Sequence, residues 1–438
     1  MAALPHPLTR LLGATLPDGE RVDVDLADGL VTAVRPAGTA TPRDAGTGTA
    51  GTDPGTDSGT LDLTGFVLLT APAEPHAHLD KALSWDLIRP PTGDLEQAIA
   101  SWRAYSSVMT TQSILDRATT AARLLLRNGT TAVRSHVDLL VGPEPLRGVR
   151  ALVALRDGLR GLMDVQLVAL AAPDTPDDVV HAALDLGVDL VGGAPHLAPD
   201  PIADLDRLLR IAQERGVGTD IHTDEGLTGD PTLVHYARAV AGWPADRLRS
   251  AGHCVRQGTL SGPQLAETVA AVVAADIGLI SLPITNLYLQ GRGHPVATPR
   301  GLTALRAFLA AGAMVAAGAD NVRDPFNPVG RSDALETASL LVTAGHLTLG
   351  EAYRAVTDSA RAVLGLPAAG AVVGARADFL AVRGTNLGDV VANAPADRRV
   401  VHGGVLVARS TAVHEVAESR TDSPGEAVGA VPSSSIRR

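Results

Sequence analysis

The stretch "EPHAHLDK", residues 74–81, places His76 and His78 one residue apart, after an apolar run and before an acid. Successive side chains of a β-strand point to opposite faces, so the two imidazoles would point the same way, with Cα atoms about 6.6–7 Å apart. That spacing lets both of them bind one metal ion. Because the chain has 13 histidines among 438 residues, such a pair can arise by chance. The surrounding sequence has to show whether this pair is part of a metal site.

Around this stretch, short apolar runs alternate with amphipathic helical segments from about residue 65 to residue 365. Predicted strands such as "TTAVRSHVD" (130–138) and "VGTDIHTDE" (217–225) are separated by predicted helices such as "PIADLDRLLRIAQERG" (201–216). Several helices end in glycine just before the next strand, as helix C-termini often do. Eight such units predict a (β/α)8 barrel. The alternative, an open doubly wound sheet, is disfavoured because no G-x-G-x-x-G follows the first strand.

Polar residues stand at the carboxyl ends of these predicted strands, where barrels of this kind carry their chemistry. We expect one divalent ion to be bound by His76, His78, His222 and Asp320. Glu225 would carry a proton, and His253 would orient or deprotonate a water molecule. Further polar residues occupy the same ends without a decided role, as packed groups, hydrogen-bond partners or substrate contacts: His136, Asp138, His196, Asp224 and Lys81.

Composition narrows the class of protein. A formal net charge of −11 without basic runs argues against nucleic acid or an anionic membrane as partner. The single cysteine, Cys254, excludes an internal disulfide framework and a multi-cysteine metal site. The N-terminus lacks the pattern of a signal peptide, and no window of 18 residues is apolar enough to span a membrane. These features predict a soluble, cytoplasmic protein.

In chain order, seven motifs together resemble the amidohydrolase superfamily, and within it the bacterial cytosine deaminase branch that includes N-isopropylammelide amidohydrolase-like enzymes. They are "EPHAHLDK" (74–81), "RSHVD" (134–138), "GGAPH" (192–196), "HTDE" (222–225), "GHC" (252–254), "TNLYLQGR" (285–292) and "GADNVRDPFNP" (318–328). The resemblance implies one Zn²⁺ or Fe²⁺ ion on His76, His78, His222 and Asp320. The fourth strand has no lysine suited to carbamylation, which favours a single ion.

The resemblance also implies a reaction and a domain plan. A metal-bound hydroxide would attack an amino-substituted N-heterocycle, with Glu225 protonating the ring nitrogen, His253 and Asp320 acting on the water, and ammonia leaving. Strand patterns at both chain ends would form one small composite β-sandwich. The expected boundaries are 1–64 for its N-terminal part, with a low-complexity insertion at 38–60, 65–365 for the barrel, 366–412 for its C-terminal part, and 413–438 for a disordered tail.

Substrate contacts carried over from the family fall on Leu95, Leu170, Ala172, Gln290, Asn321 and Phe326. Ala172 and Pro173 stand where cytosine deaminase has a glutamine that clamps the pyrimidine, and Phe326 stands in place of a tryptophan. The predicted catalytic residues therefore match those of the branch, whereas the glutamine that holds the pyrimidine is missing. An aminated ring other than cytosine is an equally good candidate for the substrate. Alternatives are a cyclic amide or alkylamine hydrolase and, more remotely, a non-catalytic barrel that binds a metal or a metabolite. The branch also allows a homo-oligomer.

Overall fold

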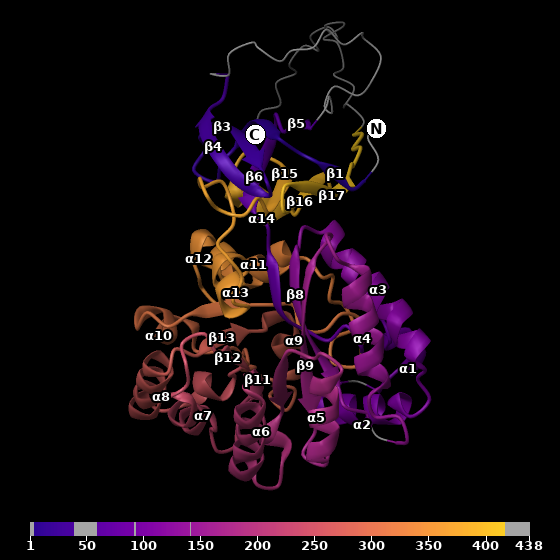
Figure 1. Cartoon of the computed structure of the whole chain (residues 1–438). Coiled ribbons are helices and arrows are strands. Elements are labelled where there is room, and N and C mark those ends of the chain that lie inside the picture. Colours follow the sequence, from indigo (N-terminus) through magenta and orange to yellow (C-terminus); the bar gives the residue numbers. More distant parts are fainter. Residues whose placement is uncertain (1–3, 39–58, 92, 141, 417–438) are drawn as a thin grey trace, which may run out of the picture.

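The computed structural model describes residues 4–38, 59–91, 93–140 and 142–416. Most of the expected low-complexity insertion and most of the expected tail lie outside these residues. Figure 1 shows two parts, a helix-covered barrel and a smaller sheet at one end of it, to which both chain ends contribute. Among the described residues, no helix is both long and apolar enough to cross a membrane.

Eight parallel strands form the barrel, in which sequence neighbours are also neighbours in space. A parallel bridge between Ala77 and Asp320 joins the first edge to the last. The predicted (β/α)8 barrel is thereby confirmed. The strands are β7 (Ala73–Ala77), β8 (Ala132–Asp138), β9 (Asp164–Ala171), β10 (Leu190–Gly193), β11 (Gly218–Thr223), β12 (Arg249–His253), β13 (Gly278–Ser281) and β14 (Val315–Ala317).

Helices follow the strands and cover the outside of the barrel, except α14, which connects two strands of the smaller sheet (Figure 1). In chain order they are α1 (Trp85–Ile88), α2 (Leu95–Ser106), α3 (Thr111–Arg127), α4 (Arg147–Gly158), α5 (Asp177–Asp185), α6 (Pro201–Arg215), α7 (Leu233–Val240), α8 (Gly262–Ala274), α9 (Pro283–Leu289), α10 (Leu305–Ala310), α11 (Ala334–Thr343), α12 (Leu349–Ala355), α13 (Asp358–Val363) and α14 (Leu387–Asn393). Two short 3₁₀ turns, η1 (Pro195–Leu197) and η2 (Arg256–Thr259), follow β10 and β12.

Helix α6 illustrates why these segments are helical. The Asp200 side chain caps its start by accepting from the Ala203 backbone N–H, and Pro201 occupies the first helical position. Gly216 ends the helix in the left-handed conformation, which costs glycine no side-chain clash. Between these ends, one face is buried, and it contains Leu205, Leu208, Leu209, Ile211 and Ala212.

The seam between the first and last strands is closed by one buried carboxylate. Glu74 accepts from the backbone N–H of His76 through Oε1 at 3.1 Å and from that of Ala319 through Oε2 at 2.8 Å. A Cβ on Gly318 would lie 2.0 Å from Glu74 Oε1, so the close approach requires glycine there. Glu74 therefore fixes the backbone beside two expected ligands, His76 and Asp320.

The smaller sheet draws strands from both ends of the chain, in the order β1-β17-β16-β15-β6-β2-β3-β4, with β5 paired to β2. Their bounds are β1 (His6–Pro7), β2 (Arg10–Thr15), β3 (Arg21–Ala27), β4 (Leu30–Pro36), β5 (Thr60–Asp62), β6 (Phe66–Thr70), β15 (Phe379–Arg383), β16 (Arg398–His402) and β17 (Val405–Ser410). Residues 66–70 pair with 379–383 in this sheet. We therefore propose that the barrel begins at β7, later than the expected residue 65.

Candidate metal centre and active site

Four side chains from three separate strand ends converge inside the barrel mouth. Nε2 of His222 lies 3.2 Å from Nε2 of His76 and 3.1 Å from Nε2 of His78. Oδ1 of Asp320 lies 3.2 Å from His78 Nε2 and 3.9 Å from His76 Nε2. The ligand atoms of His76, His78 and Asp320 all lie within 4.8 Å of one another. The four residues expected as ligands are thus brought together around one point, which we call the metal point.

This arrangement fits a divalent cation. Nitrogens bound tetrahedrally at about 2.0–2.1 Å from one ion would be roughly 3.3–3.4 Å apart, close to the observed separations. Asp320 is 2 % exposed, and within the described part of the chain neither of its carboxylate oxygens has a hydrogen-bond partner. An unpartnered buried carboxylate is costly unless a cation compensates it. The donor set, imidazoles plus one carboxylate, is the kind that Zn²⁺ and Fe²⁺ bind.

The protonation states agree with this fit. Burial lowers the pKa of His78 well below its ordinary value, and the charge of Lys81 lowers it further. Burial, followed by the charge of His76, lowers the pKa of His222 well below its ordinary value. Both imidazoles are therefore neutral at pH 7, which is the form that binds metals. Burial, reinforced by Glu225, raises the pKa of Asp320 well above its usual range, and a bound cation would oppose this increase.

Glu225 lies beside this point between two histidines. Its Oε1 is 3.6 Å from His253 Nδ1, and its Oε2 is 3.6 Å from His196 Nε2. Burial by itself raises the pKa of Glu225, but His253 and His196 outweigh it, so that the pKa is lowered. The carboxylate is therefore ionised and available as a proton acceptor.

His253 faces both Glu225 and the metal point. Burial lowers its pKa to about 4, although Glu225 opposes the shift. Asn286 Nδ2 lies 3.0 Å from His253 Nδ1, and His253 Nε2 lies 4.0 Å from Asp320 Oδ2. If the Asn286 amide donates to Nδ1, Nε2 carries the proton. His253 and Asp320 have φ angles of 67° and 64°, an uncommon conformation for non-glycine residues that concentrates at functional sites.

A second layer of polar residues contacts the expected ligand His76. His136 Nε2 is 3.1 Å from His76 Nδ1, and Asp220 Oδ1 is 3.8 Å from the same atom. Asp220 is paired with Arg134 at 2.8 Å, and both are completely buried. The sequence pattern leaves the role of His136 open, and Asp220 and Arg134 are not among the residues predicted from it. The signal was available, because each lies two residues before a histidine on its strand and so faces the barrel interior.

A cavity of about 910 Å³ opens onto this site, and its lining includes His78, His222, Glu225, His253 and Asp320. Five of the six expected substrate contacts line it: Leu95, Leu170, Ala172, Asn321 and Phe326. The exception is Gln290, which is not part of the lining. It follows the last residue of α9, and its Cβ lies so close to Gly301 that an added Cβ there would be 2.3 Å away. The end of α9 therefore places Gln290 beside the loop at residue 301.

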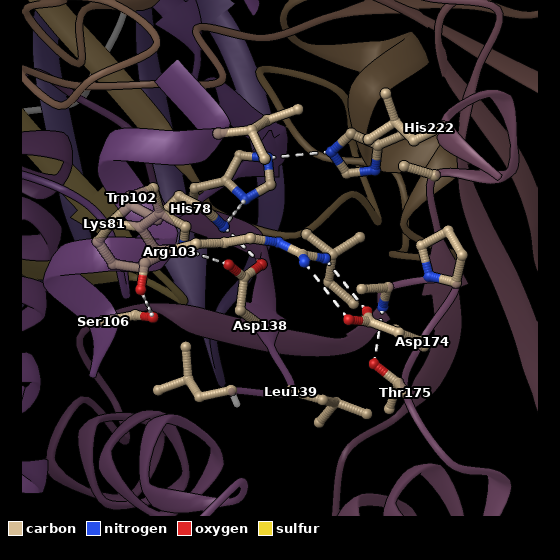
Figure 2. Close-up of a pocket in the computed structure, with 18 of the residues that line it drawn as sticks. His78, Lys81, Trp102, Arg103, Ser106, Asp138, Leu139, Asp174, Thr175 and His222 are labelled. Carbon is tan, nitrogen blue, oxygen red and sulfur yellow. Dashed lines mark hydrogen bonds and ion pairs between the residues drawn. The ribbon is translucent and has the colours of Figure 1, made fainter. Parts of the chain in front are cut away.

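Two of the undecided residues meet at the floor of this cavity (Figure 2). Lys81 Nζ lies 2.7 Å from Asp138 Oδ1 and 3.2 Å from His78 Nδ1. The other oxygen of Asp138 accepts from the indole N–H of Trp102. Asp224, by contrast, has a structural role, because its side chain accepts hydrogen bonds from the backbone N–H groups of Thr232 and Leu233.

The chain is similar to several known proteins. Residues 162–414 match the amidohydrolase family model. A pterin deaminase of Rhizobium rhizogenes is 30% identical over 419 residues, with 92% of each chain covered. A 5-methylcytosine deaminase from Klebsiella pneumoniae has 25% identity and a TM-score of 0.79, over 93% of this chain and 100% of that one. An N-isopropylammelide isopropylaminohydrolase from Burkholderia multivorans has 26% identity and a TM-score of 0.73, over 92% and 99%. The chain belongs to the amidohydrolase family.

Proposed function

We propose that this protein is a metal-dependent hydrolase that deaminates an amino-substituted N-heterocycle. One observation carries the proposal: Glu225 lines the same cavity of about 910 Å³ as the converging side chains of His78, His222 and Asp320. It lies 3.6 Å from His253, which is itself 4.0 Å from Asp320. When bound there, a divalent ion would lower the pKa of a water molecule and so supply a nucleophile near neutral pH.

The chain's own residues would move the protons. Glu225, ionised in the resting site, would take a proton from the attacking water and deliver it to the ring nitrogen next to the attacked carbon. That carbon then becomes more electrophilic, and a further proton transfer through Glu225 lets ammonia leave. His253 Nε2 lies 4.0 Å from Asp320 Oδ2 and could donate to the negative charge that develops on the attacking oxygen. The overall change is one water consumed, one ring C–NH2 converted to C=O, and one ammonia released.

A pterin-like ring is the first substrate class to test. The relative at 30% identity is a pterin deaminase, and the cavity of about 910 Å³ lies at the upper end of the range for small-molecule sites. Ala172 and Pro173 offer no side-chain amide to clamp cytosine. The ion, proposed to be Zn²⁺ or Fe²⁺, a cytoplasmic location and a homo-oligomer remain predictions.

The decisive experiment combines metal analysis with product detection. Purified protein should contain about one Zn²⁺ or Fe²⁺ ion per chain and should release ammonia from at least one ring in a panel of pterin, isocytosine, guanine, cytosine and 5-methylcytosine. Release of isopropylamine from N-isopropylammelide, with no ammonia from the panel, would favour the alkylamine hydrolase instead. A fully metal-loaded protein that releases no amine at all would contradict the proposal.

A further inference from the structure

We propose that Lys81 and Asp138 together recognise a lactam edge, a ring N–H next to a ring C=O, on the heterocycle that this site deaminates. The inference rests on the proposed function and makes it more specific. It names the substrate class as aminated rings that also carry –NH–C(=O)–, and it assigns specificity to two residues outside the catalytic set.

The positions of the two side chains support this inference. Lys81 and Asp138 both line the cavity, and Lys81 Nζ lies 3.2 Å from the ring of the expected ligand His78. Lys81 comes from the turn after β7, and Asp138 is the last residue of β8, so two neighbouring strand ends present them side by side. Figure 2 shows the Lys81 ammonium between the His78 ring and the Asp138 carboxylate. A ring bound at the metal point would reach both groups.

Both side chains also have unused hydrogen-bonding capacity. An ammonium has three donors, and an ionised carboxylate has about four acceptor positions. Asp138 uses one oxygen for Lys81 and the other for Trp102, so each oxygen keeps a further lone pair. Its side chain is 19% exposed, more than those of Lys81 and of the ligands. With its orientation fixed from two sides, the carboxylate can accept from a ring N–H, while Lys81 donates to the adjacent carbonyl oxygen.

Other polar groups that line the cavity already have partners, among them Arg103, which pairs with Asp174 at 3.1 Å. The Asn321 amide already donates to Asp324 at 2.8 Å, and the Thr175 hydroxyl accepts from the Ala172 backbone N–H at 2.9 Å. Ala172 and Pro173 provide no polar side chain at the position where the family has its clamp. A glutamine amide offers one acceptor beside one donor. The Asp138–Lys81 pair offers the same pattern, with charged partners that bind more strongly.

The test compares two rings that differ only at this edge. Isocytosine and pterin each carry the lactam, whereas 2-amino-4-methoxypyrimidine and 2-amino-4-methoxypteridine keep the amino carbon but replace N–H and C=O by a bare nitrogen and an ether. In the metal-loaded wild type, kcat/KM for the lactam ring should exceed that for its methoxy counterpart by about 10²-fold or more, because a site built for a polar edge rejects rings without it. Asp138→Asn and Lys81→Met should each reduce this ratio at least tenfold.

Because the readout is a ratio of two substrates on the same preparation, neither partial unfolding nor partial metal loss changes it. Asp157→Asn, the same substitution at an exposed ion pair outside the cavity lining, is the matched control and should keep the wild-type ratio. Ammonia released equally well from both rings by the wild type would overturn the inference and leave the proposed function intact. A ratio unchanged in both variants would overturn it as well. No ammonia from any ring in metal-loaded protein would reject the function and the inference together.

Discussion

At the scale of single residues, the site depends on neutral imidazoles and on one carboxylate, Glu225, that is not among the expected ligands. His78 and His222 are buried and uncharged, so their lone pairs are available to a cation. Glu225 is held in the ionised form by His253 and His196, although its burial favours the protonated form. Its oxygens lie 3.6 Å from two imidazoles and form no part of the ligand cluster. We therefore assign it to proton transfer and expect metal binding to survive its replacement.

Glu225→Gln tests this assignment. The amide keeps the shape of the side chain but cannot accept and return a proton, so kcat should fall by about 10²–10⁴-fold. Metal content, measured by elemental analysis, should stay at the wild-type value. Glu96→Gln makes the same change at the exposed rim of the same cavity and should keep most of the turnover. A Glu225→Gln enzyme with near-wild-type kcat would show that another group moves the proton.

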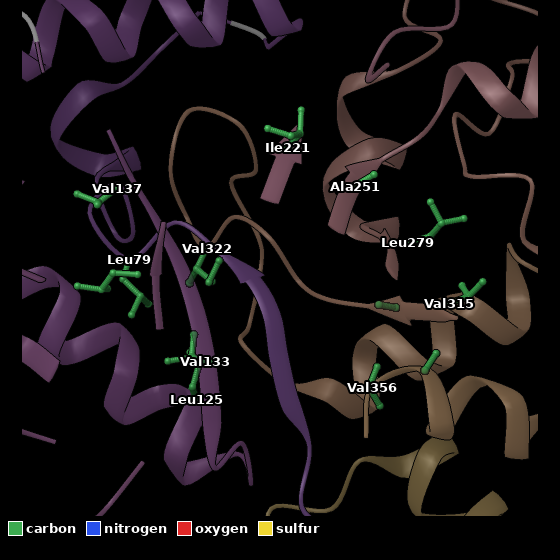
Figure 3. Close-up of a cluster of buried hydrophobic side chains, with 14 of the residues drawn as sticks. Leu79, Leu125, Val133, Val137, Ile221, Ala251, Leu279, Val315, Val322 and Val356 are labelled. Atoms are coloured by element: carbon green, nitrogen blue, oxygen red, sulfur yellow. The ribbon is translucent and has the colours of Figure 1, made fainter. Parts of the chain in front are cut away.

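At the scale of elements, the barrel strands point side chains alternately into the apolar core beneath the helices and into the barrel interior. Ile221, Ala251 and Leu279 pair across β11, β12 and β13 and belong to the apolar core between strands and helices (Figure 3). The residue after Ala251 is Gly252, which has the opposite facing and lies against the ligand layer. A Cβ added at Gly252 would lie 2.7 Å from Cε1 and 2.9 Å from Nδ1 of His76. The strand thus needs a residue without a side chain to make room for a ligand.

Gly252→Ala should weaken metal binding. The His76 ring has no free space to move into, since His136 lies 3.1 Å from its Nδ1, so the new methyl group would displace it from the shared point. Disturbing the neighbours of a ligand typically costs 10–100-fold in metal affinity, and we expect a loss in that range. The measurement is a competition titration with a chromophoric Zn²⁺ chelator.

Gly158→Ala is the matched control, because a Cβ there meets nothing within 4 Å. It should leave the metal affinity at the wild-type value. Equal affinities for wild type and Gly252→Ala would show that the barrel interior adapts more easily than this close contact implies.

At the scale of the whole molecule, a buried ionic cluster fastens the small sheet to the barrel end opposite the site. Asp378 lies 3.0 Å from Arg361 of α13 and 3.2 Å from both Arg376 and His402. Arg376 also reaches Asp164, the first residue of β9, at 2.6 Å. The two carboxylates and His402 resemble a set of metal ligands in spacing, but two guanidinium groups already occupy the centre of this cluster. Its role is therefore to join the two parts.

The cluster makes stability depend on pH. Burial alone raises the pKa of Asp378, but the hydrogen bond and charge of His402, with Arg376, outweigh it and hold the pKa below its ordinary value. A carboxyl group with a lowered folded-state pKa stabilises the protein above its unfolded pKa of about 3.9, and this contribution is lost as the pH falls through the folded value. Asp378→Asn should therefore lower the free energy of unfolding by about 3–5 kcal/mol at pH 7.

Urea unfolding of the metal-free proteins between pH 7 and pH 3, followed by circular dichroism, checks this expectation. The difference between wild type and Asp378→Asn should be constant down to about pH 4 and should shrink below it. Asp157→Asn, which removes one member of an exposed ion pair with Arg160, should change stability by less than about 1 kcal/mol at any pH. A difference between wild type and Asp378→Asn that grows on acidification would contradict the sign of the effect.

The sequence by itself was enough to predict the barrel and which four side chains gather at its mouth. Both follow from local rules: helices and strands alternate in chain order, and residues two apart on a strand share a face. His76, His78, His222 and Asp320 stand at the ends of predicted strands, and the carboxyl ends of parallel strands in a barrel must meet at one mouth. Periodicity and order along the chain therefore predicted which side chains gather, without any knowledge of distances.

Only the tertiary structure decided the contacts between side chains from different elements. Glu74 closes the seam because the register of β7 against the residues after β14 places two backbone N–H groups before its oxygens. Lys81 meets Asp138 and Gln290 misses the cavity for the same kind of reason. Such contacts depend on strand register, barrel closure and rotamers. These are set by packing among residues far apart in the chain, so no short stretch of sequence contains them.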